Sequence, residues 1–248
     1  MSPAPRPDQN TLNGASVARP DFERAKRKGV PEVILAESKS VAQSLSVAAS
    51  FLEKTGRAIL SRVSPELEAA LVETYSLEGF EWYAASRTAI IRREGGSVAP
   101  TGGRVGIVTA GTSDQAVAEQ AAIVCQEMGC TVHTIYDVGV AGLHRLFEPL
   151  RELLEVLEVD VIVVAAGMDG ALPSVVSGLV NVPVIGLPTS VGYGMGGQGQ
   201  AALLAMLQTC SPGLAVVNID NGVGAGAIAG LIANRAAAAR SDRQSSRE

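Results

Sequence analysis

The C-terminal part of the chain repeats one pattern of hydrophobic and polar positions. Short runs rich in Val, Ile and Ala each end in a cluster of Gly, Asp, Ser or Thr, and a segment with helical spacing of its apolar residues follows. The pattern predicts strands at residues 105–109, 131–136, 161–165, 183–187 and 215–219. It predicts helices at residues 113–128, 143–157, 172–179, 200–208 and 225–240. Such alternation builds a parallel sheet covered by helices, so we expect a flavodoxin-like, doubly wound α/β domain over residues 101–240.

The first hundred residues have a mixed pattern that predicts a second, smaller α/β domain over residues 21–100. Helical spacing occurs at residues 21–27, 41–55 and 65–75, and strand-like runs occur at 32–35, 58–60 and 88–92. A Gly- and Pro-containing linker at 94–103 separates this domain from the parallel-sheet domain. Residues 1–20 are rich in proline and polar residues and are expected to be disordered, and residues 241–248 form a polar tail.

Composition narrows the class of protein. Hydrophobic residues make up 47% of the chain and aromatic residues only 4%, so the core is aliphatic. No apolar run approaches the length of a membrane span, the start lacks the apolar region of a signal peptide, and three cysteines are an odd number. We therefore expect a cytoplasmic protein with free thiols and no membrane partner.

Charge is distributed unevenly between the two halves. Residues 1–100 hold 13 basic and 12 acidic residues, whereas residues 101–248 hold 7 and 13, with no lysine. So acidic a domain is a poor partner for nucleic acid. If this domain binds a phosphorylated ligand, other groups must help to neutralise the phosphate charge: backbone amides, helix N-termini, a metal or the N-terminal half.

Polar loops at the ends of the predicted strands carry the candidate chemistry. After the first strand, Gly111, Thr112, Ser113 and Asp114 either cap the next helix or bind a substrate. After the second strand, a histidine beside an arginine suits proton transfer and anion binding, although a surface histidine at a helix start is an equally ordinary reading. These two residues are His144 and Arg145.

The loop after the third strand adds Gly167, Met168 and Asp169. Asp169 is expected near Asp114 and Asp137, because the carboxyl ends of parallel strands meet at one edge of a sheet. Three carboxylates there could hold Mg²⁺, which prefers oxygen ligands, or each could only cap a helix.

A glycine-rich loop and a lone cysteine complete the candidates. Residues 192–199 contain the spacing G-x-G-x-x-G, but four residues separate the loop from its strand, so a ligand-covering loop with Tyr193 and Gly194 is favoured over a dinucleotide fingerprint. Cys210 follows the fourth helix; most buried cysteines are inert, and the residues alone leave its role open.

Residues 104–235 resemble the aminoimidazole ribonucleotide carboxylase family. The resemblance rests on Gly111-Thr-Ser-Asp114, on Ala141-Gly-Leu-His144-Arg145, and on Ala166-Gly-Met-Asp-Gly-Ala-Leu-Pro173 followed by Val182-Pro-Val-Ile-Gly186. That family lacks the extra N-terminal domain and the later segments of this chain.

Those segments resemble the pyridinium-3,5-biscarboxylic acid mononucleotide synthases of nickel-pincer cofactor biosynthesis. They are Gly29-Val-Pro-Glu-Val-Ile34, Glu81-Trp-Tyr-x-x-Ser-Arg87, Cys210-Ser-Pro-Gly213 and Val217-Asn-Ile-Asp-Asn-Gly-Val-Gly-Ala-Gly226. The resemblance covers about residues 21–235.

The resemblance to these synthases implies carboxylation of nicotinic acid adenine dinucleotide at C5 of its pyridinium ring, with release of AMP. Carbon dioxide or bicarbonate is then the co-substrate, magnesium is the expected ion, and no redox cofactor is expected. Cys210 would add to C4 of the ring, His144 would be a candidate base, and Arg87 would reach the phosphates or the ring carboxylate. A homo-octamer is implied. A purine-pathway carboxylase and a non-catalytic nucleotide-binding subunit are the alternatives.

Overall fold

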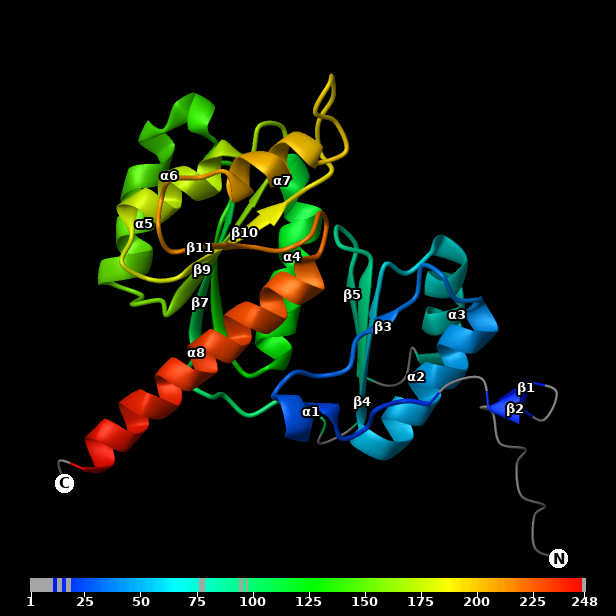
Figure 1. Cartoon of the computed structure of the whole chain (residues 1–248). Coiled ribbons are helices and arrows are strands. Elements are labelled where there is room, and N and C mark those ends of the chain that lie inside the picture. The colour runs from blue at the N-terminus through cyan, green and yellow to red at the C-terminus, as the bar shows by residue number, and fades with distance from the viewer. Residues whose placement is uncertain are drawn as a thin grey trace, which may run out of the picture. The chain divides into compact units, whose positions relative to one another are not determined.

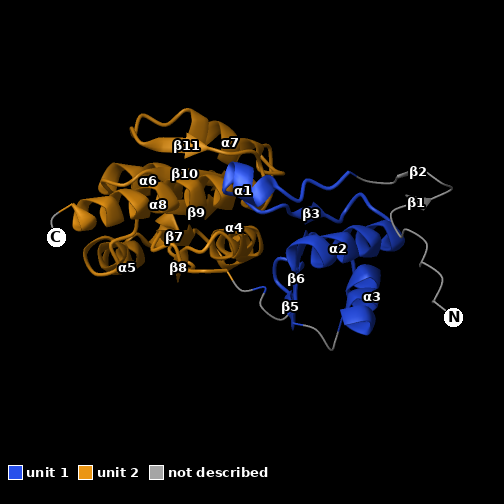
Figure 2. Ribbon diagram, turned by 90° about the horizontal axis from the view of Figure 1, so that it is seen from below, with its two compact units in different colours: residues 1–97 blue, residues 98–248 orange. Residues whose placement is uncertain are grey.

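The structure is a computed structural model, and it describes residues 11–12, 15–16, 19–75, 79–93, 96 and 98–246. The chain divides into two compact units, residues 1–97 and 98–248, which Figure 2 shows in different colours. The predicted disordered segment at 1–20 falls mostly outside the described residues. Within it, strands β1 (Thr11–Leu12) and β2 (Ala15–Ser16) pair antiparallel.

Besides the β1–β2 pair, the described residues of unit 1 form a four-stranded mixed sheet with three helices. Its elements are α1 (Arg24–Lys28), β3 (Ile34–Leu35), α2 (Val41–Thr55), β4 (Arg57–Ser61), α3 (Pro65–Tyr75), β5 (Gly79–Tyr83) and β6 (Thr88–Arg92). The strand order is β3-β4-β6-β5, with β3 and β4 parallel and the other neighbours antiparallel. This is the mixed α/β domain that the sequence predicts.

Local signals set the limits of helix α2. Ser40 and Gln43 form a reciprocal capping box at its start, and Gly56 ends it in the left-handed conformation at φ 71°. Strand β5 was not predicted, because residues 79–83 are half exposed and pair with a single neighbour, β6. An edge strand of this kind lacks the continuous apolar run of a buried strand.

Unit 2 is a five-stranded, entirely parallel sheet (Figure 1). Its strands are β7 (Arg104–Thr109), β8 (Thr131–Ile135), β9 (Val161–Ala166), β10 (Val184–Pro188) and β11 (Leu214–Val216). Its α-helices are α4 (Gln115–Glu127), α5 (His144–Glu155), α6 (Ala171–Leu179), α7 (Gln200–Leu207) and α8 (Gly222–Ser245), with short 3₁₀ turns η1 (Thr112–Asp114) and η2 (Val140–Gly142).

The strand order β11-β10-β9-β7-β8 is the flavodoxin-like order, and it confirms the predicted fold class. Every residue of β9 and β10 is buried, as expected for central strands covered on both faces. The order reverses between β7 and β9, and this switch point fixes where a ligand binds in such sheets.

Helix α8 is longer than predicted and continues through the expected polar tail as far as Ser245. An ion pair holds the predicted last residue of this helix against the sheet. The guanidinium of Arg240 binds both carboxylate oxygens of Asp160, which is only 6% exposed, and donates to the carbonyl of Gly102. The hydrogen bond to Asp160 raises the pKa of Arg240.

Small residues let α8 lie close against α4. A Cβ placed on Gly226 would stand 2.5 Å from the carbonyl oxygen of Ala121 and 2.9 Å from Cβ of Val124. Among the described helices, α8 is long and apolar enough to cross a membrane, but only by length and composition. Its buried face, which includes Gly226, Ala229 and Ala233, packs inside unit 2.

Candidate active site

A pocket of about 420 Å³ lies at the switch point of the parallel sheet. The loops that follow β7, β8, β9 and β10 all contribute to its wall, which is mostly Gly, Ala, Val and Leu. Two carboxylates, those of Asp114 and Asp169, belong to the lining, whereas no lysine, arginine or histidine does. The charge of this lining attracts a cation more than it attracts a bare phosphate.

Asp114 is a buried residue of the pocket wall, and both of its carboxylate oxygens accept hydrogen bonds. It is 3% exposed; its Oδ2 accepts a hydrogen bond from the backbone N–H of Gly111 at 2.8 Å. Its Oδ1 accepts from the hydroxyl of Thr189 at 2.6 Å. The carboxylate therefore ties the loop after β7 to the end of β10.

Asp137 and Arg145 form a separate pair outside the pocket lining. The Arg145 guanidinium donates to both the carboxylate (2.9 Å) and the carbonyl oxygen (2.5 Å) of Asp137. The backbone N–H of Asp137, whose φ is 61°, donates to the hydroxyl of Thr109. The arginine predicted to bind substrate thus braces the loop after β8.

The third loop brings its predicted residues to the pocket. Gly167, Met168 and Asp169 all line it. Gly167 is required there, because a Cβ would stand 2.7 Å from the hydroxyl oxygen of Thr189. Met168 has φ 50°, a strained conformation of the kind that concentrates at functional sites. The carboxylate of Asp169 accepts from the backbone N–H of Ala171 and so caps α6.

The predicted magnesium site on three aspartates is not assembled. Within the described part of the chain, no group of three or more His, Cys, Asp or Glu residues could hold a metal ion. The physical reason is that each carboxylate has a different partner: Asp114 binds Thr189, Asp137 binds Arg145, and Asp169 accepts from the first N–H of α6.

The remaining predicted residues of these loops are only partly in the pocket lining. Gly111 and Ser113 are in the wall, whereas Thr112 is not. His144 is the exposed first residue of α5, and it also lies outside the lining. On the glycine loop, Tyr193 is 82% exposed, and the pocket includes neither it nor Gly194.

Cys210 lies away from the pocket of its own chain. It is exposed, in the turn between α7 and β11. Because β11 is parallel to β10, this turn is at the amino ends of the strands, whereas the pocket is at their carboxyl ends. The next residue, Ser211, donates its hydroxyl to the carbonyl of Ser174 on α6. Within one chain, the structure does not bring the thiol to the pocket.

The other two cysteines are structural. The thiol of Cys125 donates to the carbonyl of Gly226, and that of Cys130 donates to the side-chain oxygen of Asn234. Burial raises the pKa of Cys125 strongly and that of Cys130 to about 11. Both therefore stay protonated at neutral pH and are poor nucleophiles.

Arg87 belongs to unit 1, in the turn between β5 and β6. Its φ is 49°, and its carbonyl accepts from the backbone N–H of Val63. Glu37 lies close by: its hydrogen bond to Arg62 (2.8 Å) and the charges of Arg62 and Arg87 lower the pKa of its carboxyl. The predicted contact of Arg87 with a substrate remains a prediction.

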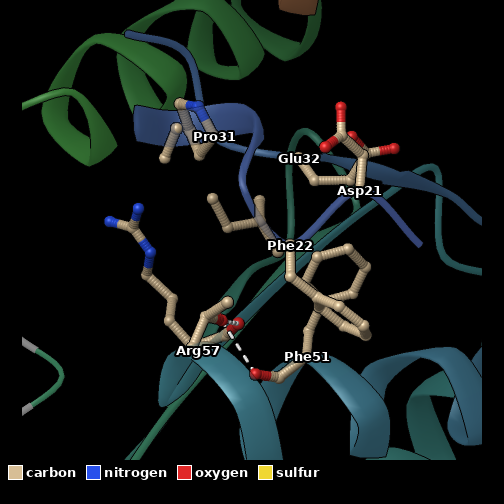
Figure 3. Close-up of a pocket in the computed structure, with 9 residues that line it drawn as sticks. Asp21, Phe22, Pro31, Glu32, Phe51 and Arg57 are labelled. Atoms are coloured by element: carbon tan, nitrogen blue, oxygen red, sulfur yellow. Dashed lines mark hydrogen bonds between the residues drawn. The ribbon is translucent and has the colours of Figure 1, made fainter. Parts of the chain in front are cut away.

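Unit 1 also has a small cavity of about 40 Å³, shown in Figure 3. The rings of Phe22 and Phe51 meet edge to face at 5.1 Å in its wall. Nearby, an ion pair of 2.7 Å joins Arg24 to Glu32. The cavity is too small for a nucleotide, and these contacts hold the segment before β3 against α2.

The sequence analysis did not identify Thr189 or Val191, which matter to this site. Val191 lines the pocket, and its carbonyl accepts from the backbone N–H of Met168 at 2.8 Å. The position of Thr189 just beyond a predicted strand was a usable signal, since polar residues at strand ends gather at the binding edge. Val191 is apolar and gave no such signal.

Comparison with known proteins defines the class. The AIR carboxylase family model matches residues 104–247, and the chain belongs to this family. A LarB/PurE-like N-terminal domain model matches residues 12–93, and the two matches together fit a LarB-like member.

Three similar proteins illustrate the relationship. The uncharacterized protein MJ0165 of Methanocaldococcus jannaschii is 44% identical over 86% of this chain and 82% of its own length. The N5-carboxyaminoimidazole ribonucleotide mutase of the same organism is 34% identical over 50% of this chain and 74% of its own. The crystal structure of PurE2 from Treponema denticola covers 59% of this chain and 98% of its own, with 18% identity and a TM-score of 0.39.

Proposed function

We propose that the protein carboxylates C5 of the pyridinium ring of nicotinic acid adenine dinucleotide and hydrolyses the phosphoanhydride, giving pyridinium-3,5-biscarboxylic acid mononucleotide and AMP. The observation that carries the proposal is the switch-point pocket, whose lining holds Asp114 and Asp169 but no cationic side chain. A cationic pyridinium is attracted to such a pocket, whereas a phosphate monoester is repelled unless backbone amides neutralise it.

The ring chemistry needs a nucleophile, because an electron-poor pyridinium does not attack carbon dioxide. Addition of the Cys210 thiolate to C4 gives a neutral dihydropyridine whose C5 is nucleophilic. C5 then bonds to the carbon of CO₂, a base removes the C5 proton, and the thiolate leaves as the ring recovers its aromaticity and charge. The anionic pocket favours that last step.

Asp114 is the base that the pocket offers. His144 lies outside the lining, whereas Asp114 is in the wall, and each of its oxygens accepts only one hydrogen bond among those found. A carboxylate has lone pairs left in that arrangement and can accept the C5 proton.

We propose that the site is shared between copies of the chain, and the position of Cys210 motivates this proposal. The turn that carries the thiol is at the opposite end of the strands from the pocket. We therefore assign Cys210 to the pocket of a second copy in a homo-oligomer, and the family resemblance suggests an octamer. A chain with Asp114→Asn and a chain with Cys210→Ser should each be inactive. Their co-expression should restore turnover in mixed oligomers.

Hydrolysis requires water to attack one of the two phosphorus atoms of the diphosphate. The bond from that phosphorus to the bridging oxygen breaks, and AMP and the carboxylated mononucleotide separate. The family resemblance implies Arg87 as a partner of the phosphates, and we propose that role for its guanidinium. The three aspartates have separate partners, so we propose magnesium only as a counter-ion bound to the substrate diphosphate.

The decisive test is product analysis. Purified protein is incubated with nicotinic acid adenine dinucleotide, isotopically labelled bicarbonate and magnesium, and the products are identified by mass spectrometry. AMP together with a labelled biscarboxylated mononucleotide supports the proposal. Turnover of aminoimidazole ribonucleotide would favour a purine-pathway carboxylase. Thermal stabilisation by the dinucleotide without any product would favour a binding subunit.

A further inference from the structure

One buried hydroxyl donates a hydrogen bond to the carboxylate that we propose as the general base of the pocket. Thr189 is fully buried, and its hydroxyl donates to Oδ1 of Asp114 at 2.6 Å. This is a short, charge-assisted hydrogen bond, of the stronger kind found in proteins. Since Gly111 holds Oδ2 of the same carboxylate, both oxygens are fixed by donors from opposite sides of the switch point.

The backbone leaves Thr189 little freedom. It directly follows β10, and its N–H donates to the carbonyl of Ala166 at 3.0 Å, which continues the pairing of β10 with β9. Gly167 packs against the hydroxyl, where any side chain would collide. A threonine is also stiff at χ1. The hydroxyl is therefore a rigid donor, held in place by the sheet.

We propose that Thr189 is a positioning residue, whose hydroxyl aims the Asp114 carboxylate at the reacting ring. Oδ1 accepts the hydrogen bond from Thr189 and Oδ2 accepts the one from Gly111, so the orientation of the carboxylate plane is set before substrate enters. Without the hydroxyl, the Gly111 N–H alone holds the group, and rotation about the Cβ–Cγ bond misaligns the remaining lone pairs. The inference rests on the proposed function, in which Asp114 accepts the C5 proton.

The test compares three variants of the full-length protein. Thr189→Val removes the hydroxyl at nearly constant shape, and Thr189→Ser keeps it. Thr109→Val is the matched control, because Thr109 is also fully buried at a strand end of the same edge, and its hydroxyl accepts from Asp137 rather than touching Asp114.

We expect Thr189→Val to lower kcat about 10- to 100-fold, the effect of losing a hydrogen bond to a charged group, with KM within about threefold of wild type. Thr189→Ser should recover kcat to within about threefold. Thr109→Val should lose similar stability but little turnover. Unchanged kcat in Thr189→Val, or equal losses in the Val and Ser variants, would overturn the inference.

A separate measurement distinguishes this failure from failure of the proposed function. If wild-type protein does not turn over the dinucleotide, the function is wrong, and the positioning role is then read from crystal structures of wild type and Thr189→Val. A carboxylate of Asp114 that keeps its orientation in the valine variant refutes the positioning role; a rotated one supports it.

Discussion

The packing of α8 against α4 gives a stability prediction that can be worked from distances. Gly226, Gly230 and Gly178 are helical glycines with different surroundings. At Gly226 an added Cβ would stand 2.5 Å from the carbonyl oxygen and 2.9 Å from Cα of Ala121. At Gly230 the nearest atoms are the sulfur and methyl of Met128, at 2.6 and 2.7 Å. At Gly178 the nearest atom is the Ser211 hydroxyl, at 3.6 Å.

Two opposing effects decide how each Gly→Ala substitution changes the free energy of unfolding. Alanine is better than glycine in a helix interior by about 1 kcal/mol. Overpacking costs about 1–3 kcal/mol, and the upper end applies where the obstacle is backbone, because a whole helix must shift. Gly226→Ala should therefore destabilise by about 2 kcal/mol. Gly178→Ala should stabilise by up to about 1 kcal/mol. Gly230→Ala should fall between them, because the end of a methionine side chain can rotate.

Thermal unfolding followed by far-UV circular dichroism measures the series. For a chain of this size about 2–4 °C accompanies each kcal/mol, so Gly226→Ala should lower Tm by about 4–8 °C. Gly178→Ala should raise it slightly. If Gly226→Ala is as stable as Gly178→Ala, the close approach of α8 to α4 is not a constraint and the packing argument fails.

Three further predictions follow from the site and from the ion pair between Asp160 and Arg240. Cys210→Ser should reduce dinucleotide turnover more than about 100-fold with the fold intact, because an alkoxide is far less available than a thiolate at neutral pH; near wild-type turnover would exclude the covalent route. Thiol titration at pH 8 should find Cys210 reactive in native protein and Cys125 and Cys130 reactive only after unfolding. Since burial raises the pKa of Cys130 from 9.0 to about 11, its stabilising contribution is full below pH 9 and is lost as pH rises through 11; alkaline urea titrations check this. Asp160→Asn should lower the free energy of unfolding by about 1–2 kcal/mol, because it weakens the ion pair with Arg240, whose side chain is 40% exposed. Glu158→Gln is the control and should lower it by less than about 0.5 kcal/mol. Equal losses of the two variants in urea denaturation would contradict a stabilising role of the Asp160–Arg240 pair.

Much of the fold could be predicted because its signals are local. Helices α2 and α3 begin and end at the predicted residues, since apolar spacing and the Ser40 and Gly56 caps lie within a few residues of the ends. The central strands followed from continuous apolar runs. Strand β5 could not be predicted in this way, because it depends on pairing with β6. The ion pair between residues 160 and 240 is also non-local and could not be predicted from the sequence.

The candidate site also has features that the sequence predicts and features that only the tertiary structure shows. The sequence by itself determined that Gly111, Asp114, Gly167 and Asp169 lie at the carboxyl edge of a parallel sheet, because alternation of strands and helices places every such loop there. Only the tertiary structure decided which of them meet. Asp114 bonds to Thr189, 75 residues away, rather than joining the other aspartates. Side-chain pairing across strand ends depends on strand order, register and the direction of each loop, and a one-dimensional pattern encodes none of these locally. For the same reason Cys210 had to be located by the direction of β11, which places the thiol at the amino edge of its own sheet.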